Sequence, residues 1–346
     1  MRRGSVAQLV AIGIVCGGGA ALVAILIPWL PDPASRQAGR IDFVFWFVTV
    51  ICIAIFALVA AVIIYSVLKF RAQPGEDMDG PPIHGNTGLE IVWTAVPAAL
   101  VTAISIVSAI VLAKNDHIPK ASAAGDPLHP LVVEVTAQQF AWSFKYTGFG
   151  DLTSATLKLP LNKPVKLRIT SLDVNHSFWV PEFGQKQDTV PGLTTKLVIT
   201  PDRVGTYPVI CTELCGLGHA VMRTSAIVMK PAAFDAWVNK QGKALAGPPG
   251  QAGKSVFVNN GCNSCHTLKA AGATAKVGPD LDKLPAEAKA TGKPLAAFVR
   301  ESIVNPDAYI APGYPKNVMP KTFSQLPKSQ LDALVQYLVS SSKSAG

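Results

Sequence analysis

The stretch of the sequence richest in potential metal ligands is Val209–Met222, which reads VICTELCGLGHAVM. It places Cys211, Glu213, Cys215, His219 and Met222 close together. Thiolates bind copper, zinc or iron–sulfur clusters, and the accompanying ligands discriminate among these metals. Two Cys and two His would suit zinc, but a methionine in the same loop is not typical of zinc, and a mononuclear blue-copper site uses a single Cys. Two thiolates this close could instead bridge two copper ions, each with one imidazole and one weak axial ligand.

Such a centre needs a second imidazole beside His219. The other histidines of the chain are His84, His117, His129, His176 and His266. His84 is excluded because it lies between two apolar runs, and His266 is excluded because it adjoins a second cysteine pair. His176 follows Val165–Thr170, whose alternation of apolar and polar residues predicts a half-buried strand, so its loop could reach the cysteines. His117 and His129 lie in Pro-rich sequence, where we expect solvated side chains, and they are the alternatives.

The second cysteine pair lies in CNSCH, Cys262–His266. This Cys-x-x-Cys-His pattern is the one in which two thiols bond covalently to haem and the histidine faces the iron. Because Met319 is the only methionine after Met229, it is the candidate for the second axial ligand. His/Met ligation is typical of electron-transfer haems with a raised reduction potential. A disulfide within each cysteine pair is the simpler alternative in an oxidising compartment.

The elements that must position these residues begin with three uncharged runs, Gly4–Pro31, Phe43–Leu68 and Ile91–Ala113. Each is long enough to cross a bilayer as a helix, which takes about 20 residues. The first run follows Arg2 and Arg3, so it is either a cleaved signal peptide or a retained helix. Lys69 and Arg71 mark the loop after the second run as cytoplasmic, which puts everything after Ala113 on the outer side.

The outer part of the chain has the pattern of two globular domains. Residues Leu131–Pro231 are rich in β-branched residues broken by Pro and Gly, which predicts a β-sandwich or barrel. The loop-like stretch Gly242–Gly253 predicts a linker. Beyond it, apolar residues at helical spacing predict an all-α domain: Leu331, Leu334, Val335 and Leu338. We therefore expect a signal peptide or extra transmembrane helix over 1–40, a transmembrane helical hairpin over 41–114, a β domain over 126–232, a linker over 233–250 and an α domain over 251–346.

Two families share these patterns. The motif Cys-x-Glu-x-Cys-x-x-x-His-x-x-Met, with the upstream Asp173–Phe178 reading DVNHSF, resembles subunit II of the haem–copper cytochrome c oxidases over about Asp42–Pro231. The remainder resembles class I cytochrome c, with Val256 and Phe257 before the haem motif and VGPDL at Val277–Leu281 after it. The whole chain is thus similar to oxidase subunits that carry a fused cytochrome c.

The resemblance implies a multidomain membrane protein with a transmembrane helical hairpin, a cupredoxin-like β-sandwich and an all-α cytochrome c domain. It implies a dinuclear copper centre known as CuA, with these ligands: His176, Cys211, the Glu213 carbonyl, Cys215, His219 and Met222. The Glu213 carboxylate would bind a magnesium ion shared with subunit I. A covalent haem c would be held by Cys262 and Cys265, with His266 oriented by the Pro279 carbonyl.

The implied function is that of the electron-transfer subunit in a proton-translocating cytochrome-c oxidase. Electrons would pass from the haem to the copper pair and on to subunit I, where oxygen is reduced to water. Partners would be subunit I, subunit III and an upstream donor such as a quinol–cytochrome c reductase or a cytochrome c. The location would be the plasma membrane of a prokaryote, with both cofactor domains on the outer face.

Three further residues have roles implied by the resemblance. Glu90, at the start of the third apolar run, matches a glutamate at a proton path into subunit I; an ordinary interfacial carboxylate is the alternative. Phe140 lies where relatives that accept electrons from a separate cytochrome c have an exposed tryptophan, and Trp142 matches a deeper tryptophan. A phenylalanine at this position is compatible with an electron donor tethered to the same chain. The alternative is that Phe140 is a conservative core substitution.

Other functions that the sequence leaves open are a nitric-oxide reductase-type complex using the same subunit, and a copper-delivery protein with an incidental haem. A nucleic-acid partner is not expected, because the net charge of +9 comes from scattered lysines rather than from cationic runs.

Overall fold

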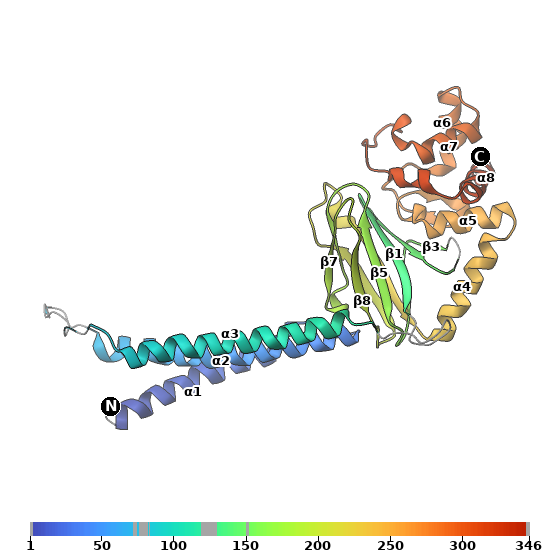
Figure 1. Cartoon of the computed structure of the whole chain (residues 1–346). Coiled ribbons are helices and arrows are strands. Elements are labelled where there is room, and N and C mark those ends of the chain that lie inside the picture. Colours follow the sequence, from blue (N-terminus) through green and yellow to red (C-terminus); the bar gives the residue numbers. More distant parts are fainter. Residues whose placement is uncertain are drawn as a thin grey trace. The chain divides into compact units, whose positions relative to one another are not determined.

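The computed structural model describes residues 3–71, 75, 82, 84–118, 130–149 and 152–343. It divides into two compact units, residues 1–33 with 39–116 and residues 34–38 with 117–346. The first unit is built from three long helices, α1 (Arg3–Leu26), α2 (Arg36–Phe70) and α3 (Thr87–Asp116) (Figure 1). All three are long and apolar enough to cross a membrane. The expected membrane character of the N-terminal part is confirmed.

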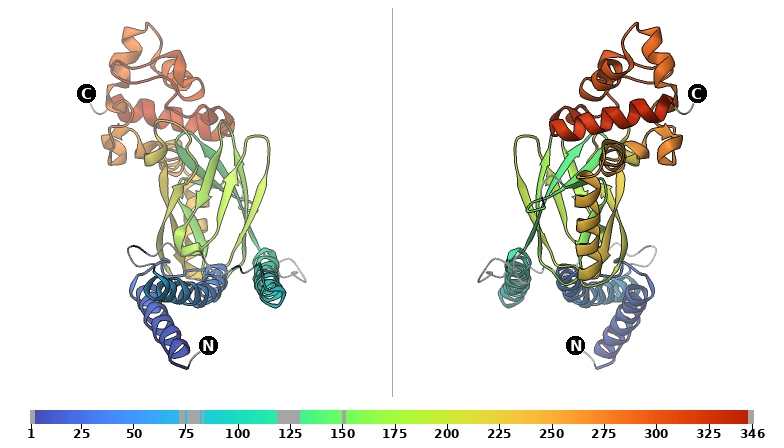
Figure 2. Two further views of the ribbon diagram at one scale, coloured as in Figure 1. Left: turned by 90° about the vertical axis from the view of Figure 1, so that its left-hand side faces the viewer. Right: turned by 90° about the vertical axis from the view of Figure 1, so that its right-hand side faces the viewer.

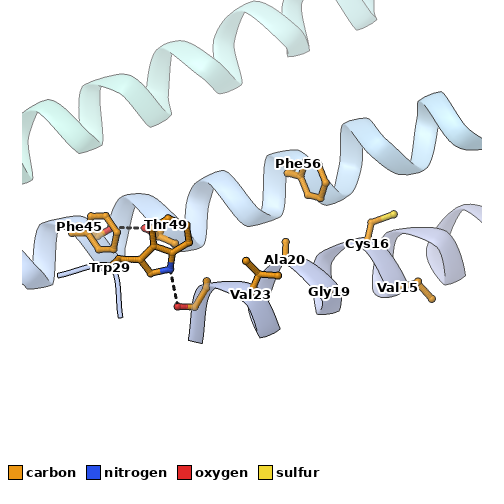
Figure 3. A pocket seen from close by; sticks show the side chains of 10 residues that line it. Val15, Cys16, Gly19, Ala20, Val23, Trp29, Phe45, Thr49 and Phe56 are labelled. Carbon is orange, nitrogen blue, oxygen red and sulfur yellow. Dashed lines mark hydrogen bonds between the residues drawn. The ribbon is translucent and has the colours of Figure 1, made fainter. Parts of the chain in front are cut away.

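Helices α1 and α2 approach each other closely where α1 has glycine. A Cβ on Gly17 would lie 3.0 Å from the Ala57 Cβ, and one on Gly13 would lie 3.7 Å from the Ala61 Cβ. Small residues on both helices let the backbones come together, as is common between helices in lipid. Beside this contact lies an apolar groove lined by both helices, and Figure 3 shows the side chains that line it, Trp29 and Phe56 among them.

The expected β domain is a sandwich of two five-stranded sheets. Its strands are β1 (Leu131–Gln138), β2 (Ala141–Tyr146), β3 (Thr153–Ser154), β4 (Leu157–Pro160), β5 (Val165–Ser171), β6 (His176–Trp179), β7 (Lys186–Thr189), β8 (Thr195–Ile199), β9 (Gly205–Cys211) and β10 (Arg223–Met229). One sheet has the order β3-β2-β1-β5-β8 and the other β4-β10-β9-β6-β7. Side chains alternate between buried and less buried along β1 and β5, as the pattern at Val165–Thr170 predicts. The strands run alongside one another in the views of Figure 2.

The stretch 233–250, expected as a linker, is mostly helical. Helix α4 (Pro231–Leu245) extends through Gly242, and only Ala246–Pro248 separate it from α5 (Pro249–Asn259). The aromatic side chains of α4 pack on the sandwich: the Trp237 ring lies 5.1 Å from that of Tyr146, and Phe234 is buried. This burial of large aromatic surface stabilises a helix where Gly and Pro suggest a loop. The right-hand view of Figure 2 shows α4 running along the strands.

The C-terminal domain is mainly helical, as expected. Its main helices are α5, α6 (Leu284–Ala290), α7 (Leu295–Val304) and α8 (Lys328–Lys343), with a short pair of strands, β11 (Thr267–Leu268) and β12 (Ala273–Thr274). The predicted apolar face of α8 is buried in its core. Helix α5 crosses α8 at Gly253, where a Cβ would lie 2.1 Å from the Ala333 carbonyl oxygen. Only glycine allows this crossing.

Candidate copper centre and haem site

The cysteine-rich loop is the connection between β9 and β10. Cys211 is the last residue of β9, and Met222 directly precedes β10. The Cys211 amide donates a hydrogen bond to the Met222 carbonyl over 3.3 Å, which closes the base of the loop. Between them the chain turns at Gly216, whose φ of +124° favours glycine. The sheet therefore fixes both ends of the loop that carries the ligand motif.

The two thiols form the middle of a cluster of donor atoms. The sulfurs of Cys211 and Cys215 lie 3.9 Å apart, and both cysteines are free. A disulfide would need a separation of about 2.05 Å. The His176 Nδ1 lies 3.8 Å from the Cys211 sulfur, and the His219 Nδ1 lies 3.6 Å from the Cys215 sulfur. Each sulfur thus has one imidazole beside it.

Two weaker donors complete the cluster. The Met222 sulfur lies 3.8 Å from the Cys215 sulfur, and the Glu213 carbonyl oxygen lies 3.2 Å from the Cys211 sulfur. A metal–thiolate bond of about 2.3 Å lets one ion bind both sulfurs at any separation below about 4.6 Å. The observed separation of 3.9 Å satisfies this limit. Two sulfurs, two imidazoles, a thioether and a carbonyl fit a pair of thiolate-bridged copper ions.

Strand pairing brings His176 into this cluster from a distant part of the sequence. Strand β6 begins at His176 and pairs antiparallel with β9, with Phe178 opposite Cys211. The His176 side chain is completely buried. His117, one alternative, is exposed, and His129, the other, lies outside the described residues. The ligand atoms of His176, Cys211 and Cys215 all lie within 4.8 Å of one another.

A second layer of contacts holds these donor groups. Asp173 Oδ1 lies 2.8 Å from the His176 Nε2, and its Oδ2 accepts a hydrogen bond of 2.6 Å from the Gln139 amide. The Gln139 side chain donates to the Cys215 carbonyl over 2.5 Å. A carboxylate on the outer nitrogen is a common way to orient a metal-binding histidine. Asp173 begins the DVNHSF motif, but no role was predicted for it, although its position three residues before His176 was a usable indication.

The two thiols differ in acidity when no metal is bound. Burial opposes ionisation of Cys211, but hydrogen bonds from His176 and from the Ser177 amide outweigh it and lower the pKa of Cys211. Burial, together with the charge of a Cys211 thiolate, raises the pKa of Cys215. Binding of a metal therefore has to displace the proton of Cys215.

Phe140 and Trp142 occupy different layers around the loop. The Phe140 ring packs on the loop glycines, and a Cβ on Gly218 would lie 2.4 Å from the Phe140 Cδ2. Trp142 is buried, and its ring lies 5.5 Å from that of Phe178 and 6.3 Å from that of His176. Phe140 therefore contacts the outside of the cysteine loop, while Trp142 supports the histidine from within.

The second cysteine pair lies at the end of α5. Cys262 begins the short 3-10 helix η3 (Cys262–Ser264), and Cys265 follows it with an exposed side chain. His266 is held by its Nδ1, which lies 2.8 Å from the Pro279 carbonyl oxygen and donates to it when protonated there. Burial lowers the pKa of His266, so its imidazole is neutral, as ligation of iron requires.

The haem-type pattern fits its surroundings. A Cβ on Gly278 would lie 2.6 Å from the His266 Cε1, so the backbone itself forms a wall beside the imidazole. Two free thiols and a neutral imidazole with its outer nitrogen held are the donor set that a covalently bound haem requires. Met319, the expected second ligand, lies half-buried in the irregular chain between α7 and α8.

Glu90 has a structural contact of its own at the start of α3. Asn86 caps this helix by accepting a hydrogen bond of 3.1 Å from the Leu89 amide, and the Glu90 Oε1 accepts one of 3.3 Å from the Asn86 amide. This reciprocal pattern resembles a capping box and accounts for a carboxylate at the helix start. It leaves the proton-path role as a prediction.

Comparisons with known proteins identify all three parts of the chain. Residues 23–111 match the family described as "Cytochrome C oxidase subunit II, transmembrane domain", residues 153–230 match "Cytochrome C oxidase subunit II, periplasmic domain", and residues 250–342 match "Cytochrome c". The families of the second and third parts imply copper and haem.

Curated relatives agree with these matches. "Cytochrome c oxidase subunit 2" of Thermostichus vulcanus is 36% identical over 64% of this chain and 80% of that protein. The protein of the same name from Alkalihalophilus pseudofirmus is 31% identical over 89% of each chain. "Quinol oxidase subunit 2" of Bacillus cereus is 29% identical over 65% of this chain and 75% of that protein.

Proposed function

The chain belongs to the cytochrome c oxidase subunit II family, and from this premise we propose that it is the electron-accepting subunit of a proton-translocating cytochrome-c oxidase. In this role a covalent haem c and a dinuclear copper centre, held by the residues named below, would carry electrons toward subunit I, where oxygen would be reduced to water. The observation that carries this proposal is the cluster of donor atoms around the Cys211 and Cys215 sulfurs, 3.9 Å apart.

The proposed copper ligands are the six groups of that cluster: His176, Cys211, the Glu213 carbonyl, Cys215, His219 and Met222. When bound, the copper pair supplies a one-electron redox centre. The protein's part is to hold two buried sulfurs in the loop between β9 and β10, with one imidazole from that loop and one from β6, before the metal arrives. Glu213 has an exposed side chain, which suits the proposed magnesium ion shared with subunit I.

The proposed haem site uses Cys262 and Cys265 for attachment, with His266 and Met319 as axial ligands. The Pro279 carbonyl fixes the orientation of His266. The bound haem supplies a second one-electron centre. We propose that it receives electrons from a quinol–cytochrome c reductase or a cytochrome c. We also propose that Phe140 and Trp142 lie at the copper end of the electron-transfer path from haem to copper.

The proposed topology has the cofactor domains on the outer face of a prokaryotic plasma membrane, beside subunits I and III. Lys69 and Arg71 after α2 support a cytoplasmic loop. We further propose that α1 is retained as a third transmembrane helix, because Gly13 and Gly17 pack against α2. The intact mass of the purified chain tests this: a mass that lacks the residues of α1 would contradict it.

The proposed role of Glu90 is proton uptake toward subunit I. Glu90→Gln should slow steady-state oxygen consumption while electron transfer from haem to copper keeps its rate. The amide can still accept the hydrogen bond from Asn86, so the helix start is preserved. Unchanged oxygen consumption would leave Glu90 with the capping role alone.

Electron paramagnetic resonance tests the copper assignment directly. Two bridging thiolates should give a mixed-valence centre with the unpaired electron shared by both ions. Cys215→Ser should give a mononuclear signal or none, whereas Met222→Leu should keep the dinuclear signal, because an axial thioether binds weakly. A dinuclear signal that survives Cys215→Ser would refute the assignment.

The haem assignment has its own test. Met319→Ala should leave the haem covalently attached through Cys262 and Cys265 but remove the sulfur–iron absorption band. A variant that keeps this band would have another axial ligand.

A further inference from the structure

The segment that carries Met319 is tied at both ends to one carboxylate. Asp307 Oδ1 accepts a hydrogen bond of 2.9 Å from the Asn317 amide, two residues before Met319. Its Oδ2 lies 2.7 Å from the Nζ of Lys321, two residues after Met319. The Lys321 ammonium also donates to the Asn317 Oδ1 over 3.2 Å, which closes a triangle of contacts around the methionine segment.

The anchoring residue is itself fixed to the helical core. Asp307 lies in a short 3-10 helix, η6 (Pro306–Ala308), directly after α7, and Pro306 is buried. Two residues further on, the Tyr309 ring packs edge-on against Phe298 of α7 with the ring centroids 5.1 Å apart. A carboxylate on this support has a defined position relative to the core.

The methionine segment has little regular structure to hold it. It lies between η6 and η7 (Lys321–Gln325), and Asn317 has a φ of +60°, a left-handed conformation that asparagine tolerates better than most residues. Ordering such a segment costs conformational entropy for every residue that is fixed. A thioether is a weak and neutral ligand, so its binding to iron is favoured when the segment is ordered in advance.

We propose that Asp307 is a positioning residue that holds the Asn317–Lys321 segment so that Met319 faces the haem iron. The hydrogen bond from Lys321, and next that from the Asn317 amide, lower the pKa of Asp307, so the carboxylate is ionised at neutral pH. The Pro279 carbonyl holds the histidine ligand, and Asp307 has the corresponding role for the methionine. This inference rests on the proposed ligation by Met319, which Met319→Ala tests separately.

The two contacts of Asp307 differ in strength. The Lys321 side chain is 62% exposed, and exposed ion pairs contribute little, on the order of fivefold or less in an equilibrium constant. The Asn317 amide donates to a charged oxygen on a side chain only 22% exposed, and such a bond contributes about tenfold or more. Asp307→Ala should therefore lose most of the effect, while Asp307→Asn, which keeps an acceptor oxygen, should lose only the ion pair.

Competition by imidazole measures how firmly the segment is closed. Added imidazole binds the oxidised iron only when Met319 has left it. The apparent Kd of imidazole is therefore proportional to the equilibrium constant for binding of Met319 to the iron, and it falls when that constant falls. In the haem-loaded full chain, Asp307→Ala should lower this Kd about tenfold, and Asp307→Asn about fivefold or less. The reduction potential should fall in the same order, because the thioether raises it.

Asp332 provides a matched control. Its carboxylate pairs with two cations, Arg300 and Lys328, whereas that of Asp307 pairs with one cation and one backbone amide. Asp332 joins α7 to α8, and among the described residues its salt bridges do not involve the methionine segment. Asp332→Ala should leave the imidazole Kd unchanged. An unchanged Kd in Asp307→Ala, or an equal fall in Asp332→Ala, would overturn the proposal.

Hydrogen exchange in the unaltered chain gives a readout that needs no variant to fold. The Asn317 amide should exchange at least about tenfold more slowly than that of the exposed Lys316, because only the former is bonded to Asp307 in the described structure. Equal exchange of the two amides would overturn the proposal even if Asp307→Ala fails to fold.

Discussion

Replacement of Asp173 by alanine tests whether the copper ligands depend on their second layer of contacts. The carboxylate accepts hydrogen bonds from the amides of Gln139 and Val174 and lies 2.8 Å from the His176 Nε2. The Ser171 hydroxyl also donates to the Asp173 Oδ1 over 3.3 Å. Asp173→Ala removes all four contacts while leaving every proposed ligand in place. The variant therefore separates ligand orientation from ligand identity.

The magnitude of the effect depends on which of the four partners can bond to another group instead. The Ser171 hydroxyl already donates to the Val174 carbonyl over 2.5 Å. The Asp173 side chain is 30% exposed, so water can replace it for the two amides. The His176 side chain is fully buried, so its Nε2 loses a partner that water does not replace. An unsatisfied buried donor costs about 1–3 kcal/mol, and loss of the partner of a metal-binding histidine typically costs about 10- to 100-fold in metal affinity. We expect Asp173→Ala to weaken copper binding by about 10- to 100-fold.

Competition with a copper chelator measures this change, and thermal unfolding of the copper-free chain measures the cost to the fold. Asp188→Ala is the matched control, because Asp188 accepts a hydrogen bond of 2.7 Å from Ser177, next to His176, without a contact to the imidazole. Asp188→Ala should keep its copper affinity within about threefold, since it removes a hydrogen bond to Ser177 and leaves the contacts of the imidazole in place. The reasoning fails if Asp173→Ala binds copper as tightly as the unaltered chain, or if Asp188→Ala weakens binding as much.

Three further predictions follow from the packing and charge of the outer domains. Gly253→Ala should destabilise the haem domain by about 1–3 kcal/mol or more in thermal unfolding, because its Cβ would lie 2.1 Å from the Ala333 carbonyl oxygen; Gly242→Ala, with open space around its Cβ, should be neutral or stabilising. Hydrogen bonds from Arg300 and then Lys328 lower the pKa of Asp332. The stability difference between the unaltered chain and Asp332→Ala should therefore be present above about pH 4 and disappear as the pH falls through the lowered pKa of Asp332. A stability difference that grows on acidification would contradict this prediction. A chain ending after Gly247 keeps α4 on the sandwich and should bind copper but accept electrons poorly from a soluble cytochrome c. The haem domain added in trans should restore only part of the rate. If the shortened chain oxidises cytochrome c as fast as the intact chain, the fused haem is not where electrons arrive.

Local patterns in the sequence determined much of the fold. The uncharged runs predicted a transmembrane helical hairpin, preceded by either a signal peptide or an extra helix, because the thickness of a bilayer sets a minimum apolar length that can be read without tertiary structure. The buried face of α8 followed from the spacing of Leu331, Leu334, Val335 and Leu338, because helical periodicity is also local. The cluster of donor groups between Cys211 and Met222 was equally readable, since one short loop closed by a strand pair must bring them together.

The tertiary structure decided the contacts between residues far apart in sequence. The sequence left His117, His129 and His176 as candidates, and it is the pairing of β6 with β9 that brings His176 to Cys211. A linker was expected where α4 forms, because its stability comes from Trp237 and Phe234 packing on Tyr146 rather than from local propensity.

The contacts that hold the ligands were also decided by the tertiary structure. Asp307 reaches Asn317 and Lys321 only because η6 and the methionine segment fold back on each other. Spacing in the sequence fixes which residues share a turn, but strand register and the packing of irregular segments depend on the whole core. The ligand types were therefore determined locally, and their orientation was determined by the fold.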